Sequence, residues 1–498
     1  MINAVRSSIT ACDCDRFAPL DSMDRPVRFH ASRSRALGAF PLLCAALVLV
    51  VVASWPPSTA RANELLVLTT DFSTGSLTSM QLGSPWSPDL DVASVCPDAV
   101  GRSYGGLFYV VNRFGCDNIQ VIDPAQNYAT VRQFSVGAGS NPQDIVFQSP
   151  TRAFVSCYDQ PTLLAVNPMT GQILDSISLA QFADSDGLPE MHRLFLEGKY
   201  LYVQLQRLDR NNGHLPVAPS YLVVIDVQTW SIVDTDVNIP GVTPIHLTGL
   251  NPTGPMEIDL VTGKLLVPVS GQFLELDGGI ERIDLARWKS DGFVVTESAL
   301  GGDLLHYTQG NGQRAFAVIS DASFATCLVA YHPVHGTKLQ TIYCTSGFEL
   351  ADCETSQEGW LYLADRTFID PGIRVFNFAG QQQGDLIPTG LPPFELTVHR
   401  PATSDAPLPG EPLVVRLPAP NPATDRVQLG LSSAAADADV HVVDALGRIV
   451  RALDVPERGQ IEWNLEDAAA NAVPSGVYWI RVRTQSGRDE AHRVVVTR

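Results

Sequence analysis

The sequence predicts an all-β protein in which a seven-bladed β-propeller is followed by a small β-sandwich. Three observations carry this prediction. A short strand pattern rich in β-branched and aromatic residues recurs seven times, each copy is accompanied by further short strand patterns, and no helical periodicity of useful length interrupts them. Four short strands every 40–50 residues or so are typical of propeller blades.

The repeated strand is clearest in "LFYVV", which starts at Leu107. Turn signals such as Gly105-Gly106 and Gly198 stand before several copies. The seven copies start at Leu65, Leu107, Ala153, Tyr200, Leu265, Ala315 and Trp360, with spacings of 42, 46, 47, 65, 50 and 45 residues.

Each copy has companions of the same strand type. A second strand follows, as in "IQVIDP" (119–124), then a third, as in "TVRQFSV" (130–136), and a short strand such as "QDIVF" (143–147) introduces the next copy. A series of β-sandwiches would also give short strands, but sandwich domains repeat at about 100 residues. The observed spacing therefore favours a propeller.

The two ends of the repeat region predict how the ring closes. The copy at Leu65 lacks an introducing strand, and one spare strand, "PFELTV" (393–398), follows the last unit. We expect this strand to pair with "LLVLT" and complete the first blade, because closure removes exposed sheet edges.

The stretch "LFYVVN…NIQVIDPAQNYATV" resembles the YVTN-type β-propeller repeat of secreted and surface-layer proteins. Tyr109 to Asn112 occupy the place of Tyr-Val-Thr-Asn in that family, and the resemblance covers about 63–400. It implies an architecture and leaves the activity open, since propellers host binding modules and enzymes alike.

A Pro-rich linker is predicted at 401–412, and short alternating strands resume in 413–498. The motifs "APNPATD" (419–425), "VVDALGRIVRAL" (442–453) and "PSGVYWIRV" (474–482) resemble the C-terminal type A sorting domain of the type IX secretion system and the Ig-like domain of the flagellar hook-capping protein. The resemblance implies an Ig-like sandwich that the export machinery recognises, with the protein released or held at the outer surface. A lone Ig-like cap is the alternative.

The N-terminus predicts a cleaved signal peptide at 1–62. Four arginines between Arg25 and Arg35 precede the apolar run "ALGAFPLLCAALVLVVVASW" (36–55), and Ala60-Arg61-Ala62 fits a processing site. The apolar run is also about long enough for a membrane anchor, which is the alternative. We expect no transmembrane segment after cleavage.

Charge and cysteine content limit the remaining possibilities. Of 34 basic and 53 acidic residues, 7 and 4 lie in 1–62, so the mature chain has a net charge of −22. Such a charge argues against binding to nucleic acid. Six cysteines remain in an exported chain, either as disulfides or as buried thiols. We expect Cys96 to pair with Cys116, and Cys344 with either Cys353 or Cys327.

No strong catalytic motif occurs, and no cofactor is predicted. Calcium is the one ion considered, because "DSDGLPE" (184–190) places Asp184, Asp186 and Glu190 around a turn; a solvated turn is the alternative. The two histidines of "HPVHG" (332–336) are interpreted as part of a hairpin turn rather than a metal site.

In a propeller, the loops that enter the first strand of each blade and those that follow the second strand lie on one face, and such loops commonly carry function. The longest insertion, 206–220, contributes to this face. The expected ligand-binding residues are Arg113, Phe114, Tyr158, Asp159, Arg207, Asp209, Arg210, His214, Asp321, Phe324, Arg366, Phe368 and Asp370. The alternative is an inert rim.

Two functions are carried forward. The first is a secreted or cell-surface, non-catalytic protein whose propeller face binds an extracellular protein or glycan. The second is a propeller enzyme such as a lactonase or a quinone-dependent dehydrogenase, whose catalytic residues we cannot place in the sequence. An uncharged central channel with exposed aromatic residues on the face would favour binding, and clustered acids and histidines in the channel would favour an enzyme.

Overall fold

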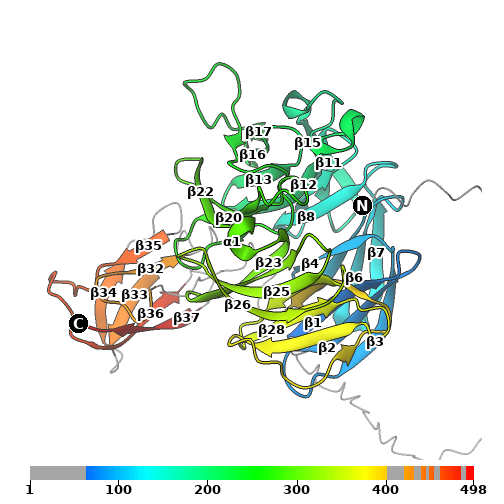
Figure 1. The fold of residues 1–498 in the computed structure, drawn as a ribbon. Helices are drawn as coiled ribbons and strands as arrows, with labels where there is room; N and C mark the ends of the chain where they lie inside the picture. Colours follow the sequence, from blue (N-terminus) through cyan, green and yellow to red (C-terminus); the bar gives the residue numbers. More distant parts are fainter. Residues whose placement is uncertain (1–62, 401–419, 431–438, 445–447, 454–459, 484–488) are drawn as a thin grey trace, which may run out of the picture. The chain divides into compact units, whose positions relative to one another are not determined.

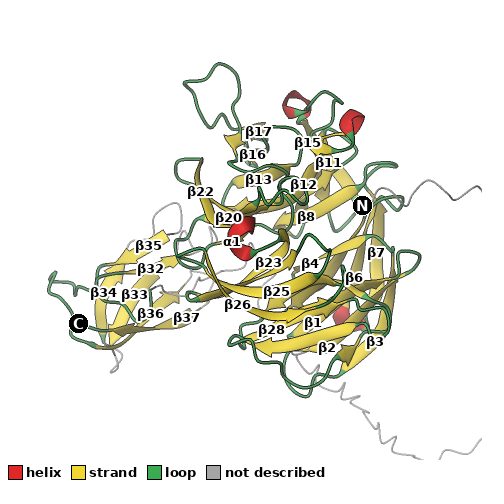
Figure 2. Ribbon diagram, in the orientation of Figure 1, coloured by secondary structure: helices red, strands yellow, loops and turns green. Residues whose placement is uncertain are grey.

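The computed structural model describes residues 63–400, 420–430, 439–444, 448–453, 460–483 and 489–498. The predicted signal peptide 1–62 and linker 401–412 lie outside these residues. The described chain is all-β: strands dominate Figure 2, and the helical segments are single turns. They are η1 (Pro124–Gln126), η2 (Ala180–Phe182), η3 (Arg210–Asn212) and α1 (Glu297–Leu300).

Residues 63–400 form successive antiparallel sheets, and the labels of Figure 1 follow their order along the chain. The first sheet contains β31 (Pro393–His399), β1 (Glu64–Thr70), β2 (Gly75–Gln81) and β3 (Pro88–Val95). The second contains β4 (Ala99–Tyr104), β5 (Leu107–Asn112), β6 (Asn118–Asp123) and β7 (Ala129–Ser135). The third contains β8 (Pro142–Ser149), β9 (Arg152–Cys157), β10 (Thr162–Asn167) and β11 (Gln172–Ser178).

The fourth sheet is the least regular, because the long insertion falls within it. It contains β12 (Met191–Glu197), β13 (Tyr200–Leu205), β16 (Tyr221–Asp226), β17 (Ser231–Ile232) and β18 (Ile245–His246). The insertion itself forms a two-stranded ribbon of β14 (Leu208–Asp209) and β15 (Leu215–Pro216).

The last three sheets return to the four-stranded pattern. The fifth contains β19 (Glu257–Ile258), β20 (Leu265–Val269), β21 (Gly279–Asp284) and β22 (Lys289–Thr296). The sixth contains β23 (Asp303–Asn311), β24 (Arg314–Ser320), β25 (Thr326–His332) and β26 (Thr337–Cys344). The seventh contains β27 (Leu350–Thr355), β28 (Trp360–Asp365), β29 (Gly372–Asn377) and β30 (Ile387–Pro388).

The burial of each strand follows its place in the sheet. The second strand, such as β5, is buried almost throughout, because neighbouring sheets pack on both of its faces, whereas the outermost strand β7 is mostly exposed. Between sheets, Tyr109 packs on Phe147 at 4.4 Å between ring centroids. The Gly105-Gly106 turn joins β4 to β5 with positive φ at both residues, as a tight two-residue hairpin requires.

The sheets close into a ring, which is the arrangement of a β-propeller. The first strands of neighbouring sheets contact one another from β31 through β4 and β8 to β12, and again from β23 through β27 to β31. Side-chain hydrogen bonds join the remaining neighbours: Gln204 donates to the Gly254 carbonyl and Gln309 to that of Ile258.

The predicted closing strand is confirmed. β31 pairs antiparallel with β1, with Leu396 opposite Val67 and Val398 opposite Leu65. The sheet that begins the propeller is thus completed by the strand that ends it.

The C-terminal unit consists of two sheets in its described residues. One contains β32 (Val427–Gly430) and β35 (Gln460–Trp463), and the other contains β34 (Ile449–Leu453), β33 (Asp439–Asp444), β36 (Gly476–Arg483) and β37 (Asp489–Val496). Val427 and Trp463 of the first sheet share one core with Val442 and Ile480 of the second. The buried Trp463 donates its indole N–H to the Glu466 carbonyl at 2.8 Å.

Candidate functional site

The first strand of a propeller sheet starts at the edge where the second strand ends, as the pairing of Ala99 with Asn112 shows for β4 and β5. We call this the entry edge. The sequence-predicted face residues lie in loops at this edge, and several contacts join the entry edges of neighbouring sheets. Arg113 after β5, for example, donates to the Gln143 side chain in β8 at 3.3 Å.

Tyr158, Asp159 and Arg210 come together at the entry edge. The Arg210 guanidinium lies 2.7 Å from the Asp159 carboxylate and 5.3 Å above the Tyr158 ring. The guanidinium also lies 3.2 Å from the Glu190 carboxylate. The backbone N–H of Arg210 donates a hydrogen bond to the Asp186 carboxylate at 3.0 Å. We call these five residues the Arg210 cluster.

Asp184, Asp186 and Glu190 offer carboxylate oxygens within 4.8 Å of one another. Burial of Glu190, with the charge of Asp186 added, raises its pKa to about 8. Arg210 already supplies a positive charge to Glu190 and Asp186. The calcium site therefore stays a prediction.

Arg207 is buried beside a pocket of about 270 Å³ that includes Tyr221, Ile239 and His246 in its lining. Its guanidinium lies 4.7 Å above the Tyr221 ring and donates to the Pro219 carbonyl. The insertion thus contributes to a cavity, although Arg207 itself is largely occupied by internal contacts.

Asp321 and Phe324 lie in the loop after β24. Asp321 accepts hydrogen bonds from the Ser323 and Ala325 N–H groups and so fixes the turn. Phe324 stacks on Phe273 at 5.9 Å, and Phe273 in turn contacts Phe348 edge-on at 6.4 Å. Phe273 and Phe348 are 39% and 48% exposed.

Arg366 lies over two phenylalanine rings, 4.7 Å from the Phe72 centroid and 5.4 Å from that of Phe394. Phe72 is 66% exposed, and Phe368 and Ile369 in the Arg366 loop are 93% and 83% exposed. We call these five residues the Arg366 surface.

Arg113 also lies over Phe394, at 5.9 Å, but it is paired with Asp98 through a 2.8 Å hydrogen bond. Phe114 beside it is 54% exposed. The remaining expected residues do not join a cluster. Asp209 ends β14 and accepts a hydrogen bond from the Asn211 N–H. His214 and Asp370 are exposed in their loops.

Two disulfides are present among the described cysteines. Cys96 is joined to Cys116 across the entry edge of one sheet, with 6.7 Å between Cα atoms. Cys344 is joined to Cys327, so the alternative pairing with Cys353 is wrong. The reason is register: Cys344 in β26 lies directly opposite Cys327 in β25, whereas Cys353 is a buried thiol in the next sheet.

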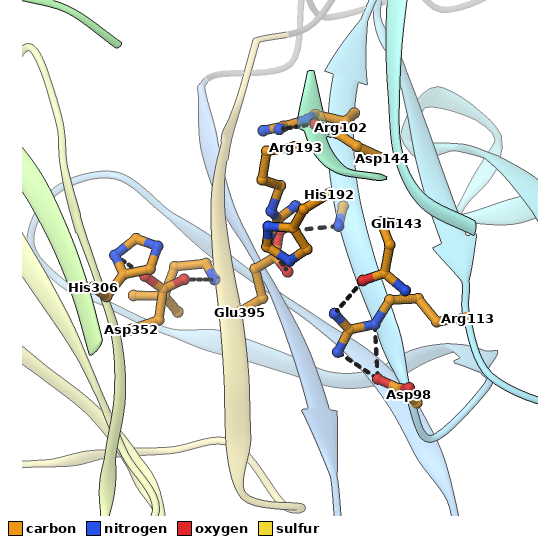
Figure 3. A network of polar contacts seen from close by, with 12 residues as sticks. Asp98, Arg102, Arg113, Gln143, Asp144, His192, Arg193, His306, Asp352 and Glu395 are labelled. Carbon is orange, nitrogen blue, oxygen red and sulfur yellow. Dashed lines mark hydrogen bonds and ion pairs between the residues drawn. The ribbon is translucent and has the colours of Figure 1, made fainter. Parts of the chain in front are cut away.

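Sequence reasoning missed a polar network on the first strands, shown in Figure 3. Arg102 of β4 binds Asp144 of β8 through two hydrogen bonds of 2.6 and 2.7 Å, and Asp144 is fully buried. Arg193 of β12 reaches Glu395 of β31 at 3.4 Å, although two other sheets stand between these strands on the shorter way around the ring. The network therefore crosses the propeller axis, and we call it the axial network.

A histidine–aspartate pair belongs to the same network. The Nδ1 atom of His306 lies 2.7 Å from Asp352, whose other oxygen accepts from the Leu396 N–H. Burial opposes protonation of His306, but the Asp352 charge and hydrogen bond outweigh it and raise the pKa of His306. Burial and the charge of Arg193 have the opposite effect on His192, whose pKa falls to about 3.

The axis is therefore charged. An uncharged channel, which would have favoured the binding hypothesis, is not what the described residues form. Its acids and bases are largely paired with one another: burial alone would raise the pKa of Asp144, but the Arg102 charge lowers it. A signal was present in the sequence, because the introducing strands "QDIVF", "EMHRLFL" and "PFELTV" each carry at least one charged residue beside apolar ones.

The described residues contain no helix with the length and apolarity needed to cross a membrane.

Residues 419–497 match the family described as secretion system C-terminal sorting domain. This match indicates export by the type IX system to the cell surface or outside, and it implies contact with the secretion machinery. No curated protein sequence matches the chain.

Solved structures provide more distant similarities. PorZ, a surface component of the type-IX secretion system of Porphyromonas gingivalis, is 13% identical with a TM-score of 0.40; the match covers 86% of this chain and 64% of that one. A putative 6-phosphogluconolactonase from Bacteroides fragilis is 14% identical, with a TM-score of 0.46 and coverage of 69% and 99%. A quinoprotein alcohol dehydrogenase-like protein from Bacteroides thetaiotaomicron is 10% identical, with a TM-score of 0.44 and coverage of 68% and 78%.

Proposed function

We propose that this chain is an exported surface or extracellular protein whose seven-bladed, YVTN-type propeller is a non-catalytic binding module for an extracellular protein or glycan. The C-terminal unit is an Ig-like sandwich that directs export. Seven successive antiparallel sheets support the number of blades, and the two-sheet core around Trp463 supports the sandwich.

One observation carries the binding role: large apolar side chains are exposed in entry-edge loops of several sheets. Phe72, Phe114, Phe273, Phe348 and Phe368 are between 39% and 93% exposed. Aromatic side chains gathered on one face of a rigid scaffold mark a binding surface, because leaving them in water is unfavourable.

An enzyme is the second candidate, and the axial network is the observation that favours it. A buried histidine beside an aspartate is the arrangement of a general base. The pairing of Arg102 with Asp144 and of Arg193 with Glu395 instead supports a structural role, in which the charged pairs link different sheets of the ring.

The test uses the full exported chain on an array of extracellular glycans and proteins. We expect a double variant, Phe72→Ser with Phe368→Ser, to lose binding at least tenfold, since a buried aromatic anchor contributes roughly 2 kcal/mol or more. Met169→Ser with Val334→Ser is the matched control, because these side chains are similarly apolar and exposed but lie in turns at the opposite edge.

Equal binding by the face variant and the unmodified chain would contradict the proposal. A stoichiometric metal or chromophore in the purified chain, together with an activity that His306→Gln abolishes, would replace it with the enzyme.

A further inference from the structure

The Arg366 surface contains a cation without a counter-ion. Among the described residues no carboxylate forms an ion pair with Arg366, whereas Arg102, Arg113, Arg193 and Arg374 each have one. Its Nε atom is buried without a hydrogen-bond partner. Burial lowers the pKa of Arg366, and no neighbouring acid raises it.

Arg152 and Arg207 also have no ion pair among the described residues, but Arg207 donates to the Val217 and Pro219 carbonyls, and Arg152 begins β9 at the opposite edge of its sheet. The mature sequence has 49 acidic against 27 basic residues, so a guanidinium has many potential partners. Removing a charge from water costs free energy unless a partner compensates. An uncompensated arginine at an entry edge therefore indicates a partner that the chain itself does not supply.

The surroundings of Arg366 hold the guanidinium in place and flank it with aromatic surface. Phe72 and Phe394 contact each other edge-on at 6.4 Å, and Arg366 lies over both rings. The planar guanidinium matches the two oxygens of a carboxylate. Phe72 stays exposed beside it, and Phe368 is exposed two residues further along the same loop, so a ligand that meets Arg366 also meets apolar surface.

We propose that the Arg366 surface binds a glycan that carries carboxylate groups, with a uronic-acid carboxylate on Arg366 and sugar rings against Phe72 and Phe368. This inference rests on the proposed binding function and names the class of ligand. A sugar stacked on an aromatic ring keeps its rim hydroxyls in water. An extended peptide would bury N–H and C=O groups on a surface formed mainly by phenylalanine and isoleucine, where they would be left without partners.

The proposal requires sparse negative charge in the ligand. The net charge of −22 repels a densely charged polyanion, whereas a single uronic acid among neutral sugars needs only a local cation. Arg113 is not a second anchor, because Asp98 already neutralises it at 2.8 Å.

The probe is a xylo-oligosaccharide that carries a single glucuronic acid, titrated calorimetrically into the full exported chain. Its methyl-esterified form is the matched ligand, because esterification removes the charge and leaves the sugars unchanged. We expect the acid form to bind roughly tenfold to hundredfold more tightly than the ester, which is the range of one charge-assisted hydrogen-bonded pair.

Variants of the chain test the same contact. Arg366→Gln should remove the preference for the acid form, and Arg366→Lys should retain only part of it, because lysine lacks the planar fork. Arg314→Gln is the control: Arg314 begins β24 at the opposite edge and donates to Gln340. Melting temperatures of all variants establish that the fold is retained.

Equal affinity for the acid and ester forms, or an unchanged preference in Arg366→Gln, would overturn the carboxylate contact. Absence of binding by the unmodified chain would overturn the glycan class. Tighter binding of an acidic pentapeptide would overturn it in favour of a protein ligand. In each of these cases the proposed function still stands if the array ligands are lost in the Phe72 and Phe368 double variant, and it fails if they are not.

Discussion

At the scale of single residues, the structure contrasts arginines that are paired with carboxylates with Arg366, which has no such partner among the described residues. Arg102 makes two short hydrogen bonds to the fully buried Asp144, which also accepts from the Leu194 N–H at 2.9 Å. Arg366 has rings on its flanks and no carboxylate partner in the described chain. The two arginines differ in their partners and not in their chemistry, since one is paired with a buried carboxylate and the other is not.

Arg102→Leu should destabilise the folded chain by about 3 kcal/mol, because it leaves the Asp144 carboxylate buried without its cation. Adding Asp144→Asn should restore part of this loss, since the asparagine carries no charge and its single carbonyl oxygen still accepts from one of the two backbone N–H groups that Asp144 binds. Chemical denaturation of the two variants and of the unmodified chain measures both effects. A single variant as stable as the unmodified chain would show that the pair contributes nothing.

At the scale of elements, β31 is the strand on which ring closure depends. It pairs with β1 through Leu396 and Val398, and Leu396 is buried with Leu65 and Val67 in one core cluster. It also contributes Glu395 to the axial network. Loss of this strand would expose an edge of β1 and the apolar face that β31 covers.

We therefore expect a chain that ends at Leu391 to melt well below a chain that ends at Arg400. Both lack the C-terminal unit, so the difference isolates the contribution of β31. Calorimetry or tryptophan fluorescence measures the two transitions. Equal melting temperatures would mean that β1 does not need this partner.

At the scale of the whole molecule, several groups at the axis retain protons that the unfolded chain releases. Burial, with the charge of Glu257 added, raises the pKa of Glu354 well above 4.5. Burial likewise raises the pKa of Glu257, and Asp352 raises that of His306 despite its burial. For each group the folded chain binds more protons than the unfolded chain, so the stabilisation is present at low pH and is lost as the pH rises.

The melting temperature should consequently be higher at pH 5 than at pH 8, because these three groups together outweigh His192, whose lowered pKa of about 3 stabilises the folded chain as the pH rises. The stabilisation by the two glutamates begins to fall above their ordinary pKa of 4.5. The stabilisation by His306 begins to fall above its ordinary pKa of 6.5. Glu354→Gln should reduce the difference between the two pH values, while the exposed Glu358→Gln should leave it unchanged. A melting temperature that rises from pH 5 to pH 8 would contradict the assignment of these protons.

Much of the fold could be predicted because strand type and spacing are local properties. The pattern of "LFYVV" and its relatives placed the second strand of each sheet, and the spare "PFELTV" identified the closing strand. The C-terminal motifs led to the sorting domain for the same reason, since they are short and contiguous.

The candidate site was predicted only in part. Loop residues such as Arg366 and Arg210 were expected at one face, but not their partners, because Phe72, Phe394 and Glu190 come from distant loops and strands. Cys344 had two possible partners until the register of β25 and β26 placed Cys327 opposite it.

The sequence by itself determined that the chain is built from short antiparallel strands and that its last propeller strand belongs with its first. Only the tertiary structure decided which charges meet at the axis and that Arg366 has no carboxylate partner among the described residues. Arg193 and Glu395 are 202 residues apart and come within 3.4 Å only because the ring closes. Periodicity along the chain specifies strands and their faces, whereas contacts across a closed ring depend on the position of every sheet in it.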